Sequence, residues 1–449
     1  MSTAGGSFLD RERTVAGPGY SRWLIPPAAL AIHLCIGQGY ALSVFNIPMS
    51  RLLGITKSTP DDWSLSTTVW MFNIAFAVLG ASAFAWGKWL ERVGPRKAMF
   101  ASAVCFAGGF FAAAVAVTLH SLPLLYAAFA LYGVGLGLGY ISPVSTLIKW
   151  FPDRPGMATG MAIMGFGGGA LIGSPLAQNL MDHFKSETSM GVAPTFVTMG
   201  VLYFVFMMFG VVTVRVPPPG YAPKGYEAGA PKKIATVPPV TADEALKTPQ
   251  FWLLWAVLFL NVTAGIGVLS QASPMIQESF AGRVTPSAAA GFVGVISLFN
   301  LLGRFFWSSI SDYIGRKPTY AIYFALGTAL YCAVPSLGRL GSIGLFVAAF
   351  ALIFTMYGGG FSTVPAYLRD LFGVDQVGAI HGRLLTAWSA AAIAGPSILT
   401  YMREYQLGHG VAKAEAYTIT MYVMASLLVA GLVCNALVKP VDPKHHARA

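Results

Sequence analysis

Long apolar runs alternate with short polar segments along almost the whole chain. An α-helix needs roughly 20 apolar residues to cross about 30 Å of hydrocarbon, and each run is about that long. The pattern therefore predicts an all-α membrane protein with twelve spans, near residues 24–48, 64–86, 98–119, 122–148, 156–181, 192–214, 251–277, 286–309, 318–336, 341–367, 379–402 and 416–438.

The longest polar interruption, residues 216–250, is rich in Pro, Gly and Lys and is typical of a linker between domains. We expect its last part to form a short surface helix. The predicted domains are then a tail at 1–22, a six-helix bundle at 23–215, the linker at 216–250, a second six-helix bundle at 251–438 and a tail at 439–449.

The two predicted bundles repeat each other in sequence. GKWLERVGPRK at 87–97 follows span two as SSISDYIGRK at 308–317 follows span eight, so that Glu91 matches Asp312 and Gly94 matches Gly315 at one offset. At an offset one residue larger, three more positions match: Pro143, Gly156 and Gly160 with Pro365, Gly378 and Gly382. Such parallel repeats predict a substrate site where two bundles meet and a rocking motion about it.

Charge supports a membrane protein and predicts its orientation. Only 10% of the residues are charged, against about 25% in soluble domains, which excludes a soluble globular enzyme. Most Lys and Arg fall in the segments that would be cytoplasmic, and the predicted outer segments hold only Arg51, Lys57, Lys185, Arg283, Arg339, Arg403 and Lys413. We expect a multi-pass protein of the bacterial inner membrane with both termini in the cytoplasm, and the net charge of +11 does not require a nucleic-acid partner.

Several motifs resemble those of a known transporter family. The pattern G-x3-[DE]-R-x-G-[RK]-[RK] of the major facilitator superfamily is matched by Gly87, Glu91, Arg92, Gly94, Arg96 and Lys97, with Pro95 inserted. Within that superfamily, GQGYALSVFNIP, KWFPDRPGMATGMAIMGFGGGALIG and LKTPQFWLLW resemble the oxalate/formate antiporter family, relatives of the monocarboxylate transporters. The resemblance implies the transport of small carboxylates across the lipid bilayer, by exchange with another anion or together with protons. We expect a monomer, with no cofactor and no metal ion.

Arg304 lies within a predicted span and has no acid within a helical turn of it in that span. A guanidinium is planar and stays protonated, so it can donate two parallel hydrogen bonds to a carboxylate. The resembling family places its carboxylate-binding arginine at this point in span eight. We predict that Arg304 clamps the substrate and that Asn300, one turn earlier, orients it. The alternative is a cation that extends to the nearby membrane surface.

Aromatic side chains from both bundles match the family's aromatic cage, namely Tyr40, Tyr140, Phe166, Tyr357, Phe361 and Trp388. Any one of them could instead pack between helices. None of the 18 acids lies at the centre of a span, so a carboxylate proton relay is not expected. His33, which would share a helix face with Tyr40, is the candidate proton carrier. The alternative is a histidine hydrogen-bonded into packing.

The charged loops after spans two and eight are predicted to act as conformational latches. They hold Gly87, Glu91, Arg92, Gly94 and Arg96 in the first repeat, and Asp312, Gly315 and Arg316 in the second. We expect their contacts to form in one conformational state and to be released in another.

One sequence position distinguishes a carrier of monocarboxylates from a carrier of oxalate. Oxalate carriers of the resembling family have a lysine three residues after a tryptophan in span eleven, where this chain has Ala391 after Trp388. A second carboxylate left unpaired would cost several kcal/mol, which favours monocarboxylates such as lactate, pyruvate or formate. Phe166 and Phe361 replace hydroxylated rings of the oxalate carriers and point the same way. The alternatives are a dicarboxylate exchanger of the oxalate/formate type and a transporter-like carboxylate sensor.

Overall fold

The computed structural model describes residues 7–223 and 238–447, so that positions 224–237 of the predicted linker lie outside the described residues. Within these ranges the chain is almost entirely helical, and twelve helical stretches are long and apolar enough to cross a membrane. The predicted all-α fold and its twelve spans are confirmed. The short surface helix expected before span seven is α8, Ala242–Ala245.

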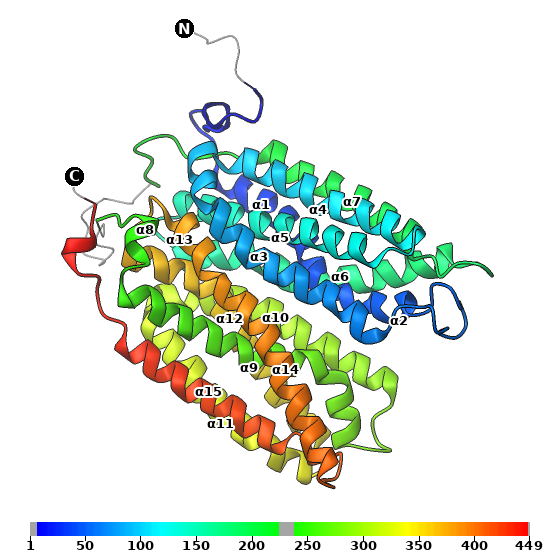
Figure 1. Cartoon of the computed structure of the whole chain (residues 1–449). Coiled ribbons are helices and arrows are strands. Elements are labelled where there is room, and N and C mark those ends of the chain that lie inside the picture. The colour runs from blue at the N-terminus through cyan, green and yellow to red at the C-terminus, as the bar shows by residue number, and fades with distance from the viewer. Residues whose placement is uncertain (1–6, 224–237, 448–449) are drawn as a thin grey trace. The chain divides into compact units, whose positions relative to one another are not determined.

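The helices follow the chain in the order shown in Figure 1. The first half contains η1 (Arg11–Thr14), η2 (Arg22–Leu24), α1 (Ile25–Ile36), η3 (Gly37–Phe45), α2 (Asn46–Met49), α3 (Leu65–Val93), α4 (Pro95–Thr118), α5 (Leu122–Trp150), α6 (Pro155–Phe184) and α7 (Val192–Thr213). After α8 come α9 (Pro249–Ser279), α10 (Pro286–Ile314), α11 (Arg316–Arg339), α12 (Ile343–Phe372), α13 (Val377–Leu384), α14 (Thr386–Gly408), α15 (Thr418–Leu437) and η4 (Pro443–His445).

Two of the predicted spans are interrupted. The first changes from α-helix to 3-10 helix at Gly37, where the backbone lies so close to Phe166 and Gly169 of α6 that a Cβ atom would overlap them. The eleventh is divided at Leu385, between α13 and α14. Hydropathy registers both as continuous spans because neither break interrupts the apolar run.

The predicted loops after spans two and eight are single-glycine turns. Helix α3 continues to Val93, and Gly94, with φ +85°, is followed directly by α4. Gly315, with φ +90°, joins α10 to α11 in the same way. Glycine adopts such positive φ values without a steric penalty. The expectation of charged loops is therefore wrong in this detail, because Glu91 and Asp312 lie on the last turns of helices.

Threonine caps begin two helices of the second half. The hydroxyls of Thr248 and Thr285 accept hydrogen bonds from the backbone N–H groups of Phe251 and Ala288, and a proline follows each cap. A proline at the first helical position lacks only an N–H group that would have no partner within the helix. The Thr-Pro pairs thus fix where α9 and α10 begin.

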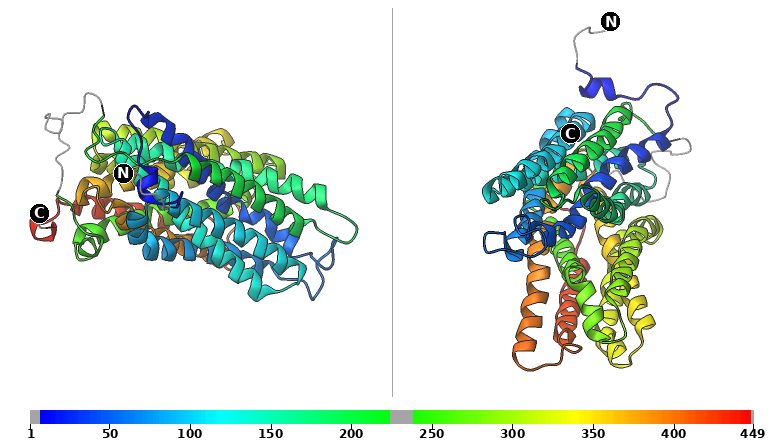
Figure 2. Two further views of the ribbon diagram at one scale, coloured as in Figure 1. Left: turned by 90° about the horizontal axis from the view of Figure 1, so that it is seen from above. Right: turned by 90° about the vertical axis from the view of Figure 1, so that its right-hand side faces the viewer.

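The described chain forms two compact units. Unit 1 contains residues 7–153, 161–223 and 376–386, and unit 2 contains residues 154–160, 238–375 and 387–447. In unit 1, α5 packs against α3 and α4, and α13 packs against α3. In unit 2, α12 packs against α10, and α15 packs against α9 and α11. Figure 2 shows the long helices of unit 2, coloured green to red, running roughly parallel to one another.

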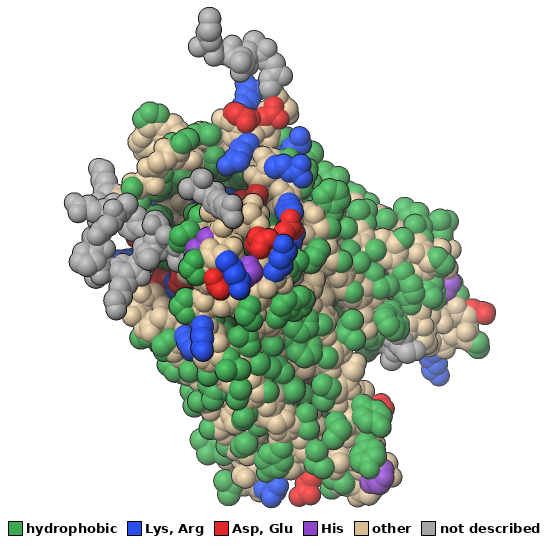
Figure 3. Space-filling model, turned by 60° about the vertical axis from the view of Figure 1, so that its left-hand side comes forward, with side chains coloured by type: hydrophobic (Ala, Val, Ile, Leu, Met, Phe, Trp, Pro, Cys, Tyr) green, Lys and Arg blue, Asp and Glu red, His purple; other side chains and the backbone are tan. Residues whose placement is uncertain are grey.

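Apolar side chains cover the outer surfaces of the helices. On the face drawn in Figure 3 most of the helix surface is hydrophobic, and charged side chains gather towards helix ends. On α7, Val205 is 60% and Phe206 61% exposed. Exposed apolar surface of this extent on long helices is what contact with lipid requires.

Candidate functional site

Arg304 lies on α10 with its side chain fully buried. Its Nε donates a hydrogen bond to Oδ1 of Asn300, 3.2 Å away and one turn earlier. The guanidinium also lies 5.1 Å from the centre of the Phe361 ring, a favourable position for a cation over an aromatic face. The alternative of a cation reaching the membrane surface is therefore wrong.

Glycines on α12 allow it to approach α10 closely enough for these contacts. A Cβ atom on Gly358 would overlap the backbone and side chain of Asn300, and one on Gly303 of α10 would overlap the backbone of Thr355. Small residues at such contacts let helix backbones come close. The glycine run at 358–360 thus positions Phe361, the next residue, beside Arg304.

Phe361 is the centre of an aromatic group in unit 2. Its ring meets that of Trp388 at 4.6 Å and that of Tyr357 at 5.3 Å, both edge-on. Ala391, on the turn of α14 that follows Trp388, is also fully buried. The structure therefore brings five predicted substrate residues together in unit 2: Asn300, Arg304, Tyr357, Phe361 and Trp388.

Tyr140 of α5 is the centre of a second group, in unit 1. It is fully buried, and its ring lies 5.4 Å from that of Phe166 on α6. Phe166 in turn meets Tyr40 at 5.0 Å, and Tyr40 stacks on Phe76 of α3. The three remaining predicted aromatics, Tyr40, Tyr140 and Phe166, are thus adjacent to one another.

His33 contacts this second group, but not in the way its spacing predicts. Because the helix becomes 3-10 at Gly37, the seven-residue step from His33 to Tyr40 does not make two α-helical turns. His33 instead meets Tyr140 edge-on at 5.3 Å. Its Nδ1 is 3.3 Å from the carbonyl oxygen of Ala29, which is the hydrogen-bonded packing that the alternative interpretation describes.

Sequence reasoning missed a second buried histidine in unit 1. His381 of α13 is 1% exposed, and its ring lies 5.8 Å from that of Tyr140. Two residues on, the buried guanidinium of Arg383 lies 5.3 Å from the ring centre of Phe84 on α3. Both residues lie near the start of the predicted span 379–402, where polar residues are common. The repeat offers a signal, since it matches Gly378 and Gly382, on either side of His381, with Gly156 and Gly160.

Glu91, on the last turn of α3, binds three groups within unit 1. It accepts hydrogen bonds from the backbone N–H of Gly378 at 3.0 Å and from the Ser145 hydroxyl at 3.1 Å. It also forms an ion pair with Lys149 at 2.6 Å. A carboxylate at the first turn of α13 interacts favourably with the positive end of that helix dipole.

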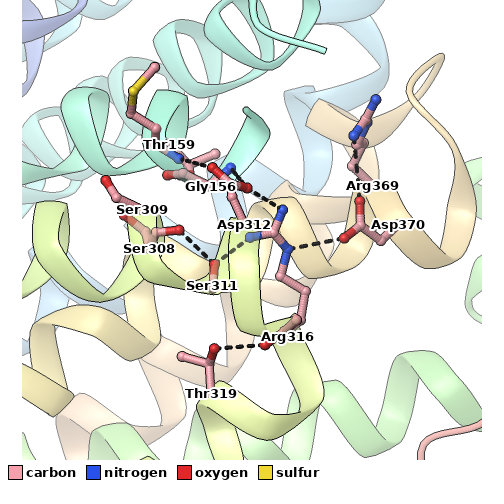
Figure 4. A network of polar contacts seen from close by, with 12 residues as sticks. Gly156, Thr159, Ser308, Ser309, Ser311, Asp312, Arg316, Thr319, Arg369 and Asp370 are labelled. Carbon is pink, nitrogen blue, oxygen red and sulfur yellow. Dashed lines mark hydrogen bonds and ion pairs between the residues drawn. The ribbon is translucent and has the colours of Figure 1, made fainter. Parts of the chain in front are cut away.

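Asp312 plays the same part in unit 2, as Figure 4 shows. Its two oxygens accept hydrogen bonds from the backbone N–H groups of Gly156 and Met157, each at 2.8 Å, at the start of α6. It also forms an ion pair with Arg316 at 2.6 Å. Arg316 binds Asp370 of α12 at 3.0 Å, which ties three helices together.

Each of these contacts joins a residue of one sequence repeat to a residue of the other. The acid of the first repeat binds the glycine of the second, and the acid of the second binds the glycine of the first. Each unit therefore includes a short segment from the opposite half of the sequence. Two matching sets of residues thus make two matching helix-capping contacts.

The other predicted latch residues have different surroundings. Arg96 is buried and donates hydrogen bonds to the backbone oxygens of Phe8 and Val214, at 3.0 and 3.1 Å, so it holds the amino-terminal segment. Arg92 is exposed. Gly87 lies against the backbone of Ala379, where a Cβ atom would be too close.

The sequence and the fold both match known transporters. The profile of the Major Facilitator Superfamily matches residues 28–396 and 262–449. The chain is 28% identical to the oxalate:formate antiporter of Oxalobacter formigenes, covering 84% of this chain and 83% of that protein. It is 24% identical to apicoplast pyruvate carrier 1 of Toxoplasma gondii, covering 93% and 89%.

The structure of the transporter FucP in the outward conformation superposes with a TM-score of 0.63, at 13% identity, over 92% of this chain and 99% of that one. At such identity the likeness shows the fold alone. The predicted resemblance to the superfamily and to the oxalate/formate antiporter family is confirmed. With its twelve membrane-spanning helices, its repeated motifs and its profile match, the chain belongs to the Major Facilitator Superfamily and is a multi-pass membrane transporter.

Proposed function

We propose that this transporter is a secondary carrier of small monocarboxylates, of the lactate, pyruvate or formate class, working by alternating access. The observation that carries the proposal is the full burial of Arg304 against Asn300 and Phe361. A buried guanidinium in a membrane helix is costly and usually serves an ion or substrate pathway. A carboxylate would supply the counter-charge and accept two parallel hydrogen bonds.

Ala391 is evidence for a substrate with one negative charge rather than two. It lies one turn after Trp388 and is fully buried, so unit 2 has no lysine at the place where oxalate carriers of the family have one. The apolar rings of Phe361 and, in unit 1, Phe166 add no hydrogen-bond donor. A dicarboxylate would leave its second charge without a partner here.

A dicarboxylate exchanger is the second candidate, because the oxalate:formate antiporter is among the relatives. The pyruvate carrier among the relatives supports the monocarboxylate proposal. The aromatic groups around Tyr140 and Phe361 would then exclude larger solutes, while the tyrosine hydroxyls orient the carboxylate. Glu91 and Asp312 would act as latches whose helix-capping contacts form and break during the cycle.

Uptake into proteoliposomes tests the proposal. The purified protein would be reconstituted in lipid vesicles and given labelled pyruvate, lactate, formate or oxalate, with and without an internal anion or a pH gradient. We expect uptake of at least one monocarboxylate above that of protein-free vesicles. The proposal fails if none of the three monocarboxylates enters under any of these conditions.

A further inference from the structure

We propose that His381 binds the proton that travels with the carboxylate, which makes this carrier a proton symporter. The inference rests on the proposed carboxylate transport and adds to it the coupling ion and the residue that holds it. It follows from the burial of His381, its place in the repeat and the charges around it.

His381 is a buried polar group with unused hydrogen-bonding capacity. Its side chain is 1% exposed, and neither ring nitrogen has a hydrogen-bond partner among the residues that the structure describes. A buried donor or acceptor without a partner costs about 1–3 kcal/mol, so a purely structural role explains this side chain poorly. A histidine that gains a proton and an anionic neighbour during the cycle recovers that cost.

The repeat shows what a structural side chain does at this position. By the offset that matches Gly378 and Gly382 with Gly156 and Gly160, His381 corresponds to Thr159, and Tyr140 corresponds to Ser362. In unit 2 the Thr159 hydroxyl donates to the backbone oxygen of Ser362 at 2.6 Å. The equivalent pair in unit 1 makes a ring contact with no hydrogen bond of this kind.

The same comparison gives matching contacts to the glycines beside Thr159 and His381. Gly160, next to Thr159, lies against the backbone of Arg304, and Gly382, next to His381, lies against the backbone of Ala83. Ala83 is the residue that the repeat matches with Arg304. In the repeat, the segment that carries His381 in unit 1 thus corresponds to the segment that packs against Arg304 in unit 2.

Two titratable side chains lie beside the His381 ring. His33 on α1 and Tyr140 on α5 are the titratable side chains of the group that includes the His381 ring. Arg383 is two residues away, about 200° around the helix, and its guanidinium lies over Phe84 of α3. It is thus directed away from Tyr140.

Two further charges near α13 form an ion pair of their own. On α3 and α5, Glu91 and Lys149 are paired at 2.6 Å at the first turn of α13. The pair contributes no net charge, and the acid caps the helix through Gly378. Because burial disfavours a charged ring, the imidazolium would form only when an anion arrives beside it.

The coupling step conserves charge and atoms. A free ring nitrogen of neutral His381 takes one proton from water on the side where the carboxylate enters, and the imidazolium balances the anion. Release of the anion on the other side removes that balance, and the same nitrogen returns the proton to water.

The test compares proton-driven accumulation with simple exchange in proteoliposomes. An inside-alkaline gradient of about one pH unit is a tenfold ratio of proton concentrations. A carrier that moves one proton with each pyruvate can therefore sustain an internal pyruvate concentration about tenfold above the external one. Exchange of labelled pyruvate for internal pyruvate needs no net proton movement. His381→Thr, the residue of the other repeat, should exchange pyruvate but show no accumulation above the external concentration, and its exchange rate should lose the pH dependence of the unaltered protein.

Two matched substitutions sharpen the comparison. His183→Thr changes an exposed histidine at the end of α6 and should leave accumulation intact. His33→Gln identifies the alternative proton carrier. The proposal is overturned if His381→Thr still accumulates pyruvate, or if accumulation is lost with His33→Gln and kept with His381→Thr.

A measurement on the unaltered protein does not depend on the folding of any variant. A pH indicator in the vesicle lumen should record a proton entering with each pyruvate molecule. Pyruvate exchange without such acidification would overturn proton coupling and leave the carboxylate proposal standing. If the unaltered protein moves no carboxylate at all, the proposed function fails and this inference fails with it.

Discussion

Phe361 lies in contact with other residues on which substrate recognition would depend in unit 2. Its ring contacts the guanidinium of Arg304 on one side and the rings of Tyr357 and Trp388 on others. Arg304 is therefore held between an aromatic face and the amide of Asn300, with little freedom to change its position. A guanidinium fixed in this way loses less conformational entropy when it binds a carboxylate.

Replacing Arg304 tests the clamp. Arg304→Ala should reduce labelled pyruvate uptake by about 30-fold or more, because losing one partner of a buried charge pair costs about 2–5 kcal/mol. Arg304→Lys should also fail largely, since a point charge cannot reproduce the planar pair of hydrogen bonds. Normal detergent extraction and gel-filtration profiles would show that both variants insert and fold. Near-normal uptake by Arg304→Ala would refute the clamp.

Ala391 offers a gain of function. Ala391→Lys should strengthen the inhibition of pyruvate uptake by oxalate about tenfold or more, the effect of about 1.4 kcal/mol, because the second carboxylate gains a partner. Ala391→Met fills a similar volume without charge and serves as the control. An equal change in both variants would mean that size, rather than charge, sets the preference at this position.

Some individual residues could be predicted from sequence and others could not. Arg304 stands out because a lone cation in an apolar run is rare, and Asn300 follows from helical spacing. His381 could not be predicted, because it lies near the edge of an apolar run, where polar residues are common. Its burial depends on the packing of α13 against α3 and α5, which no local pattern encodes.

At the scale of the element, the ends of α3 and α10 have the same structure, as their matching sequences predict. Each helix ends in an acid one turn before a positive-φ glycine, and each acid accepts a hydrogen bond from the first turn of another helix. The favourable interaction of a carboxylate with a helix amino terminus is worth about 0.3–1 kcal/mol when exposed and more when buried. Contacts of this strength can hold a state and still be released.

Asp312→Asn tests the latch. The amide keeps the shape of the side chain but loses the charge that binds Arg316 and the start of α6. Turnover in vesicles should fall more than pyruvate affinity in detergent, because the latch sets the populations of states rather than the binding contacts.

A neighbouring acid provides the control for this variant. Asp370 also binds Arg316, yet it does not cap α6, so Asp370→Asn should have the smaller effect on turnover. A loss of affinity in Asp312→Asn that matches its loss of turnover would assign Asp312 to substrate binding instead.

The elements themselves were largely predictable. Twelve apolar runs gave twelve spans because the length needed to cross a bilayer is fixed by its thickness. The change to 3-10 helix at Gly37 was not predictable, since it depends on the close approach of α6. The same is true of the glycine turns, where helix rather than loop extends to Gly94 and Gly315.

At the scale of the whole molecule, the two compact units do not coincide with the two halves of the sequence. Residues 154–160 belong to unit 2 and residues 376–386 to unit 1, although each segment comes from the opposite half of the chain. Both segments begin within a few residues of the glycine whose N–H binds a repeat acid. The exchanged segments are thus where the proposed latch contacts form.

Competition for uptake tests the central claim most directly. Labelled pyruvate uptake by the unaltered protein would be measured at neutral pH against increasing lactate, formate or oxalate. We predict that at least one of these monocarboxylates inhibits about tenfold more strongly than oxalate, because Arg304 can neutralise only one of the two charges of oxalate. Stronger inhibition by oxalate than by unlabelled pyruvate, lactate and formate would contradict the monocarboxylate assignment.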